Sequence, residues 1–159
     1  MSPFARLIEA VGKKNALRLM QLYPPYVGAG VRVDDIADDV SAITVSMTLR
    51  PWNQNAFGTH FGGSLYSLCD PWFVLLLVAQ LGPEYVCWDK SATIHFLRPG
   101  KGKVSARFDV AAVVDDIRAG VAAAGKINPV LVAFVKDDAG DVVCRVEKTL
   151  SIRKKGGAR

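Results

Sequence analysis

The sequence predicts an α+β fold in which an antiparallel sheet encloses one apolar helix. Residues 64–81 are apolar on nearly every side of a helical projection, and a helix of that kind has to be buried all round. Segments with the two-residue alternation of strands occur on both sides of it, separated by turn signals. The chain has 159 residues, which is enough for one domain with a substantial core, so we expect a single domain over 1–159.

The remaining elements follow from periodicity and turn residues. A helical pattern over 4–22, interrupted at Gly12, predicts an N-terminal helical extension over about residues 1–25. The segments with strand patterns are 31–36, 43–50, 92–97, 104–114, 129–136 and 142–152. A short helix is expected over 115–124. The sequence Asp-Asp-Ala-Gly-Asp at 137–141 is typical of a hairpin turn between the last two strands.

Charge and composition exclude several classes of function. The net charge is +5, but residues 153–159 hold four basic and no acidic residues, so the rest of the chain is nearly neutral. Proteins that bind nucleic acid carry their excess charge on the folded body, so we expect no nucleic-acid partner and a flexible basic tail over 153–159. The three cysteines have no zinc or disulfide spacing, and we expect no metal and no cofactor.

Neither a membrane span nor a secretory signal is predicted. The longest uninterrupted apolar run is 72–79, shorter than the ~20 residues that a transmembrane helix needs. The first six residues lack the apolar stretch and the cleavage site of a signal peptide. We therefore expect a cytoplasmic protein with no membrane partner.

The residues that could take part in a reaction lie at the beginning of the apolar helix. Gly62 and Gly63 open the helix, where the first backbone amides have no internal partner and the helix dipole is positive. Such amides can polarise a carbonyl oxygen. Asn55 and His60 stand just upstream as side-chain donors, and Asp70 puts a carboxylate inside an apolar helix. Together these residues predict a site for a carbonyl substrate.

This segment resembles the hotdog-fold acyl-CoA thioesterases, whose helix opening reads N-x-x-G-T-x-H-G-G followed by L-x-x-L-x-D. The matching residues are Asn55, Gly58, Thr59, Gly62, Gly63, Leu65, Leu68 and Asp70. The segment from Val86 to Pro99 resembles the strand of that family that ends in F-L-x-P. With its D-P and W-D-K-S-A segments, the chain looks like a domain-of-unknown-function subgroup related to the phenylacetic-acid-degradation type.

The resemblance implies a fold, an assembly and roles. The fold would be a hotdog, with a curved antiparallel sheet of five to six strands around one long central helix, plus the N-terminal helix. The resemblance gives Asp70 the role of general base or nucleophile. It gives the Gly62 amide the role of polarising a thioester carbonyl, with Gly63 beside it, and Asn55 the positioning of the carbonyl or the water. Hotdog proteins are homodimers or dimers of dimers, which implies the same here.

Several residues have alternative interpretations. Phe61 stands where the family has histidine, and His60 lies one place earlier and points elsewhere. Asp70 could instead cap a helix that starts at Pro71, because Asp-Pro is an ordinary helix start. Asp89 could hold a water near the site or simply pair with a neighbouring lysine. Arg98 and Lys101 could bind the phosphates of coenzyme A or could be a solvated strand end.

Three functions are compatible with these residues. The first is hydrolysis of an acyl-CoA or acyl-carrier thioester with an apolar acyl group. The second is a non-catalytic acyl-binding protein of the same fold, which Phe61 in place of histidine favours. The third is a hotdog dehydratase, which has less support because the catalytic histidine of its helix-opening loop has no clear counterpart.

Overall fold

The N-terminal part of the chain, up to Ala29, is helical. The structure is a computed structural model and describes residues 3–156. Helices α1 (Pro3–Val11) and α2 (Lys13–Leu19) are followed by a 3-10 turn, η1 (Met20–Leu22), and by α3 (Pro24–Ala29). Gly12 separates α1 from α2 with a φ of 81°, a conformation that glycine adopts without strain. The predicted interruption at Gly12 is therefore confirmed.

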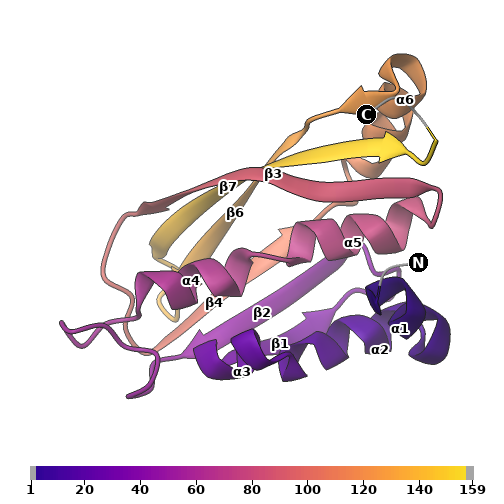
Figure 1. The fold of residues 1–159 in the computed structure, drawn as a ribbon. Coiled ribbons are helices and arrows are strands. Elements are labelled where there is room, and N and C mark those ends of the chain that lie inside the picture. The colour runs from indigo at the N-terminus through magenta and orange to yellow at the C-terminus, as the bar shows by residue number, and fades with distance from the viewer. Residues whose placement is uncertain (1–2, 157–159) are drawn as a thin grey trace.

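One antiparallel sheet forms the body of the molecule (Figure 1). Its path runs β1-β2-β4-β6-β7-β3, and the two-residue strand β5 pairs with β7 off this path. The bounds are β1 Val31–Ile36, β2 Ala42–Thr48, β3 Tyr85–Phe96, β4 Lys103–Asp109, β5 Lys126–Ile127, β6 Val130–Asp137 and β7 Val142–Lys154. The predicted α+β architecture is confirmed, and β5 is a strand that the sequence did not predict.

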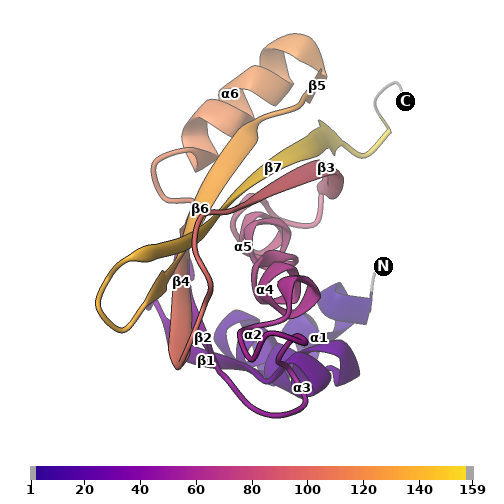
Figure 2. The ribbon, with the colours of Figure 1, turned by 90° about the vertical axis from the view of Figure 1, so that its left-hand side faces the viewer.

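The sheet wraps around a broken central helix made of α4 (Gly62–Cys69) and α5 (Trp72–Leu81). Figure 2 looks roughly along this helix and shows the strands curving over it, while α1–α3 lie beside it near β1. Trp72 is fully buried and its ring lies 5.8 Å from that of Tyr26 in α3. Phe73 meets Phe108 of β4 edge to face at 5.0 Å. The central helix is thus covered by the sheet on one side and the N-terminal helices on another.

Helix α6 (Val114–Ala124) leads from β4 towards β5 and β6. It turns only a narrow apolar stripe inwards, consisting of Val114, Ile117 and Val121. The short helix expected over 115–124 is therefore confirmed.

The central helix is broken near its middle. The helix is interrupted at Asp70–Pro71, because proline has no backbone N–H to continue the ladder. Asp70 is the C-cap of α4 and has αR conformation, and Pro71, not Asp70, is the N-cap of α5. The alternative role of Asp70 as a helix N-cap is therefore wrong.

The last strand is longer than expected and shortens the proposed tail. β7 continues to Lys154, where Arg153 pairs with Val86 and Lys154 pairs with Tyr85. The amide of Lys155 also donates to the carbonyl of Glu84 at 2.8 Å. The prediction of a flexible tail is therefore wrong for residues 153–155. Residues 157–159 of the predicted tail lie outside the described residues.

By length and composition alone, the segment Gly62–Leu81 could cross a membrane. In this fold it is the core helix, and 56% of its most apolar window is buried inside the protein. The enclosure of this helix by the sheet accounts for its apolar composition.

The position of β7 predicts where the C-terminus can be cut. Deletion of 156–159 leaves β7 complete and should leave the melting temperature unchanged. Deletion of 153–159 removes the pairing of the strand end with β3 and should cost about 2 kcal/mol, which is roughly 5 °C for a domain of this size. Thermal denaturation followed by circular dichroism measures both, and equal melting temperatures for the two truncations would contradict this role of the strand end.

Candidate active site

The loop before the central helix is anchored by a buried asparagine, Asn53. Its amide nitrogen donates to the carbonyls of Ala29 and Thr48 at 2.9 and 3.0 Å, and its Oδ1 accepts from the amide of Arg50 at 2.7 Å. Its own carbonyl accepts from the amide of Phe61 at 2.9 Å. Asn53 therefore ties α3, β2 and the start of α4 together, a role that the sequence did not reveal.

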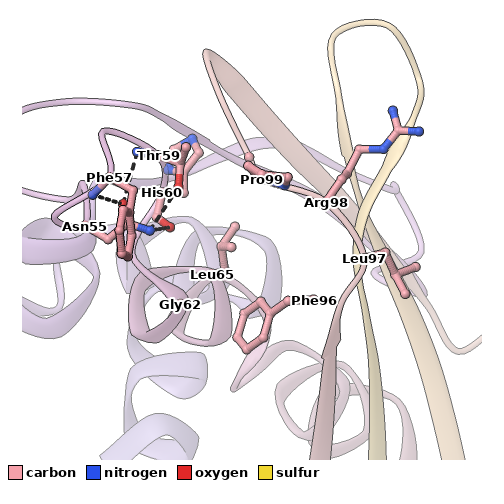
Figure 3. Close-up of a pocket in the computed structure, with 11 residues that line it drawn as sticks. Asn55, Phe57, Thr59, His60, Gly62, Leu65, Phe96, Leu97, Arg98 and Pro99 are labelled. Atoms are coloured by element: carbon pink, nitrogen blue, oxygen red, sulfur yellow. Dashed lines mark hydrogen bonds between the residues drawn. The ribbon is translucent and has the colours of Figure 1, made fainter.

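Asn55 closes the rest of this loop on itself. Its Oδ1 accepts from the amides of Phe57 and Thr59, and its Nδ2 donates to Thr59 Oγ1 at 2.9 Å. Gly58 has a φ of 74°, which the tight turn requires. In this structure the Asn55 amide is engaged by the loop, so its first effect on any reaction is to shape the loop (Figure 3).

A cavity of about 540 Å³ lies at the N-terminus of α4. It is lined by Asn55, Phe57, Thr59, His60, Gly62, Leu65, Phe96, Leu97, Arg98, Pro99 and Gly100. Phe61 is the N-cap of α4 and makes no side-chain capping hydrogen bond. The first amides of α4, beginning with Gly62, have no partner inside the helix, so they can act as donors at the edge of this cavity.

Aromatic rings pack closely over the two glycines. A Cβ on Gly62 would lie 3.0 Å from Cζ of Phe96, and one on Gly63 would lie 2.4 Å from Cε1 of Phe61. Figure 3 shows the Phe96 ring directly beside the turn of α4 that carries Gly62. Glycine at these positions lets the rings reach the backbone, and side chains there would have to displace them.

His60 is buried in the wall of the cavity. Its Nε2 lies 3.1 Å from the carbonyl oxygen of Gly102. Because a carbonyl oxygen can only accept a hydrogen bond, Nε2 carries the ring proton. Burial lowers the pKa of His60, and the hydrogen bond to Gly102 opposes that change only in part. A neutral imidazole fixed to a backbone carbonyl is a structural group, consistent with the prediction that His60 does not replace the histidine of the motif.

Arg98 and Lys101, the two basic residues that could bind the phosphates of coenzyme A, lie in different positions relative to the cavity. Arg98 lines the cavity, but Figure 3 shows its guanidinium turned away from the glycines. It forms an ion pair with Asp141 in the turn between β6 and β7. Lys101 is exposed and does not line the cavity.

A second group of residues lies at the break between α4 and α5. The ammonium of Lys148, on β7, contacts the carbonyl oxygen of Asp70 at 2.5 Å, Oδ1 of Asp70 at 2.9 Å and Oδ1 of Asp89 at 3.0 Å. It also lies 5.5 Å from the centre of the Tyr66 ring. The structure thus links Asp70 and Asp89 through Lys148, a residue that the sequence analysis missed.

The charges of this group influence one another. Burial alone would lower the pKa of Lys148, but the hydrogen bonds and charges of Asp70 and Asp89 outweigh it and raise that pKa. Burial raises the pKa of Asp89, and the attraction of Lys148 offsets this only in part. Lys148 is therefore a stable cation, whereas Asp89 is the carboxylate that takes up a proton more readily than usual.

The predicted site residues fall into two groups within one chain. Asn55, His60, Gly62 and Arg98 line the cavity, while Asp70 and Asp89 do not. Eight residues separate Gly62 from Asp70, or about 12 Å along a helix. Within one chain, the first amides of α4 and the carboxylate of Asp70 are therefore too far apart to act on the same atom. Among residues 3–156, no group of three or more metal-ligating side chains is found.

Comparison with known proteins identifies the family. The sequence profile of the DUF4442 family, a domain of unknown function, matches residues 12–152. The chain belongs to this family. No curated protein matches the sequence.

Solved structures with the same fold come from several bacteria. Protein PA5026 of Pseudomonas aeruginosa, described as a probable thioesterase, superposes with a TM-score of 0.78 at 18% identity, covering 89% of this chain and 95% of that one. The thioesterase HI1161 of Haemophilus influenzae gives 0.64 at 16% identity, covering 88% and 90%. The PaaI protein of the Escherichia coli phenylacetic acid degradation operon gives 0.60 at 18%, covering 91% and 94%. The predicted hotdog fold is confirmed.

The buried lysine predicts an asymmetric response to mutation. Replacing Lys148 by Met leaves two carboxylates without their cation and should lower the free energy of unfolding by about 3 kcal/mol. Replacing Asp89 by Asn should lower the free energy of unfolding only slightly. Burial already disfavours the ionised form of Asp89, and Lys148 retains Asp70 as its ion-pair partner. Chemical denaturation at pH 7 measures both, with Lys136→Met on the exposed face of β6 as the control. Equal losses for Lys148→Met and Lys136→Met would contradict the ion-pair role.

Proposed function

We propose that this protein hydrolyses thioesters in which an apolar acyl group is joined to coenzyme A or to an acyl carrier. The observation that carries the proposal is the uncapped N-terminus of α4, which opens on a cavity of about 540 Å³. The thioesterases among the proteins of the same fold support it. The cavity wall is mostly apolar, with Leu65, Phe96 and Leu97, which suits an acyl group.

In this mechanism the thioester carbonyl accepts hydrogen bonds from the Gly62 and Gly63 amides. Those amides are fixed before the substrate binds, so they stabilise the developing oxyanion without rearrangement. Asp70 removes a proton from water as the water oxygen attacks the carbonyl carbon, or attacks that carbon directly. In either case the carbon–sulfur bond breaks and the thiolate takes a proton. Attack by water releases the acid at once, whereas attack by Asp70 leaves a mixed anhydride, which water hydrolyses to release the acid and regenerate the carboxylate.

The 12 Å separation within one chain requires that the two halves of the site come from two chains. β3 is the last strand on the path of the sheet, and its exposed side chains include Trp88 and Phe96 near opposite ends. An open edge of twelve residues is a template for pairing with another strand. We infer a homodimer in which two copies of β3 pair antiparallel.

The register of such a pair brings the two halves together. Phe96 lies against Gly62, and Asp89 shares Lys148 with Asp70, so the two ends of β3 mark the two halves of the site. Antiparallel pairing centred between Ala92 and Thr93 would set Asp89 opposite the partner's Phe96. Asp70 of one chain then approaches Gly62 of the partner subunit, and two-fold symmetry generates a second site.

Acyl binding without turnover is the second candidate. Phe61, exposed at the N-cap where related thioesterases have histidine, favours it. Incubation with a panel of acyl-CoAs, with a reagent that traps free thiol, separates the two functions. A thiol released in proportion to enzyme indicates hydrolysis, and binding without thiol release indicates the second function.

The carboxylate is tested by Asp70→Asn. The substitution keeps the shape of the side chain and removes its basicity, so turnover should fall by at least about 100-fold. Affinity for an unreactive thioether analogue of the substrate should stay within a few-fold of wild type. The matched control is Asp116→Asn, an exposed position on α6. Turnover by Asp70→Asn at the level of this control would exclude Asp70 as base or nucleophile.

The shared site is tested by mixing two inactive chains. Gly62→Leu should block the amides of α4, because even a Cβ there meets Phe96 at 3.0 Å. Gly62→Leu and Asp70→Asn homodimers should both be inactive, whereas a heterodimer carries one site with neither substitution. Purified heterodimers should therefore recover about half of the wild-type kcat. Heterodimers as inactive as the two parents would exclude a site built from two chains.

A further inference from the structure

Lys148 is the one buried residue with a full charge among residues 3–156, since the other buried polar residues are serines, Asn53 and the neutral His60. Its side chain is 0% exposed, whereas the side chains of Asp70 and Asp89 are 46% and 35% exposed. The ammonium therefore lies behind the two carboxylates, on the protein side. The carboxylates form the surface that a substrate would meet.

All three N–H groups of the ammonium have acceptors. Two are carboxylate oxygens and the third is the carbonyl of Asp70, all within 3.0 Å. A lysine with its donors used in this way has none left for a substrate, and its positive charge makes it no nucleophile. Any part it takes in a reaction has to pass through the carboxylates.

The strand that carries Asp89 is irregular at this point. Lys148 is paired across the sheet with Ala92, and the register of β3 shifts between Asp89 and Ser91. A shift of this kind is a β-bulge, which re-aims side chains and is common beside active sites. The bulge at Lys90 brings the carboxylate of Asp89 to an ammonium that is not its direct neighbour in the sheet.

We propose that Lys148 is the positioning residue of the carboxylate site: its ammonium holds the carboxylate of Asp70 in one orientation, while Asp89 competes for the same cation. The inference deepens the proposed function, on which it rests for the role of Asp70. One positive and two negative charges leave the group with a net charge of −1. The charge of Lys148 and the charge of Asp89 therefore act on Asp70 in opposite directions.

A purely structural role would be to cap α4. A cation at a helix C-terminus is favourable, and the Asp70 carbonyl is such a cap. That role needs neither the contact with Oδ1 of Asp70 nor the contact with Asp89. It also predicts no effect of Asp89 on the ionisation of Asp70, which is where the two interpretations differ.

Within residues 3–156, the charges that act on Lys148 are those of Asp70 and Asp89, and the charges that act on Asp89 are those of Lys148 and Asp70. Tyr66 and Cys69 belong to α4, and Tyr26 comes from α3. Burial raises the pKa of all three, so they are neutral near pH 7. Lys148 from β7 and Asp89 from β3 are then the charged groups that act on the carboxylate of Asp70.

The test compares Lys148→Met with Asp89→Asn in the full-length protein. The measurement is kcat and KM between pH 4 and 9 with an acyl-CoA that the wild type hydrolyses, and Lys136→Met is the matched control. In Lys148→Met the pH at which activity falls on the acid side should rise by about one unit. Its kcat should fall at least about tenfold with KM nearly unchanged. In Asp89→Asn the same midpoint should move to lower pH.

Opposite shifts in the two variants support the proposal. Unchanged midpoints, or shifts in the same direction, would overturn it, because a lysine that only caps α4 changes stability and not the acid limb. If Lys148→Met does not fold, Asp89→Asn decides alone: a shift to lower pH supports the proposal and an unchanged midpoint overturns it.

A second readout separates this proposal from the proposed function. Carbon-13 NMR of protein labelled at aspartate carboxyls follows the titration of Asp70 without any substrate. If no acyl-CoA is hydrolysed, the proposed function fails. The midpoint of Asp70 should nevertheless move up in Lys148→Met and down in Asp89→Asn. An Asp70 titration that is the same in wild type and both variants would overturn the role of Lys148 whatever the enzyme assay gives.

Discussion

The architecture depends on the enclosure of a helix that is apolar on nearly every side. Leu68, Leu76 and Leu77 are fully buried, so the helix needs cover around its circumference. A flat sheet covers one face of a helix only. The curved sheet and helices α1–α3 together provide the rest, and this arrangement leaves the start of α4 facing the loop over 53–60 (Figure 2).

The break in this helix is what introduces polarity into the core. Pro71 cannot donate to the helical ladder, and carbonyl groups near it need other partners. The indole Nε1 of the buried Trp72 donates to the carbonyl of Leu68 at 2.7 Å, and Lys148 donates to that of Asp70. The group that satisfies the backbone at the break is thus the same group that holds the two carboxylates.

Local patterns in the sequence were sufficient for the fold. The alternation over 43–50 and the Asp-Gly turn at 137–141 correspond to β2 and to the β6–β7 hairpin of the structure. The break at Pro71 is also local in origin, because the missing N–H acts within one turn. The end of β7 was placed too early, because residues 153–155 are held by pairing with β3 and by Glu84, which no local pattern reveals.

Lys148 was missed although a signal for it exists. It occupies the inward phase of β7, between the buried Val146 and Leu150, where an apolar residue is expected. A charged residue in that phase indicates a buried partner, yet its partners Asp70 and Asp89 lie on other elements. Asn53 was missed for the same reason, since its acceptors belong to α3 and β2.

The separation of the two halves of the site also follows from the helix. Amides that can polarise a carbonyl exist only at the start of α4, whereas a carboxylate can be accommodated only where the helix is broken and Lys148 supplies a counter-charge. These two requirements cannot be met at one point of one helix. In the proposed mechanism a single chain therefore carries both groups at a fixed distance, and the proposed antiparallel pairing with a second copy would bring them together. On this argument, pairing of β3 serves the chemistry as well as the open edge of the sheet.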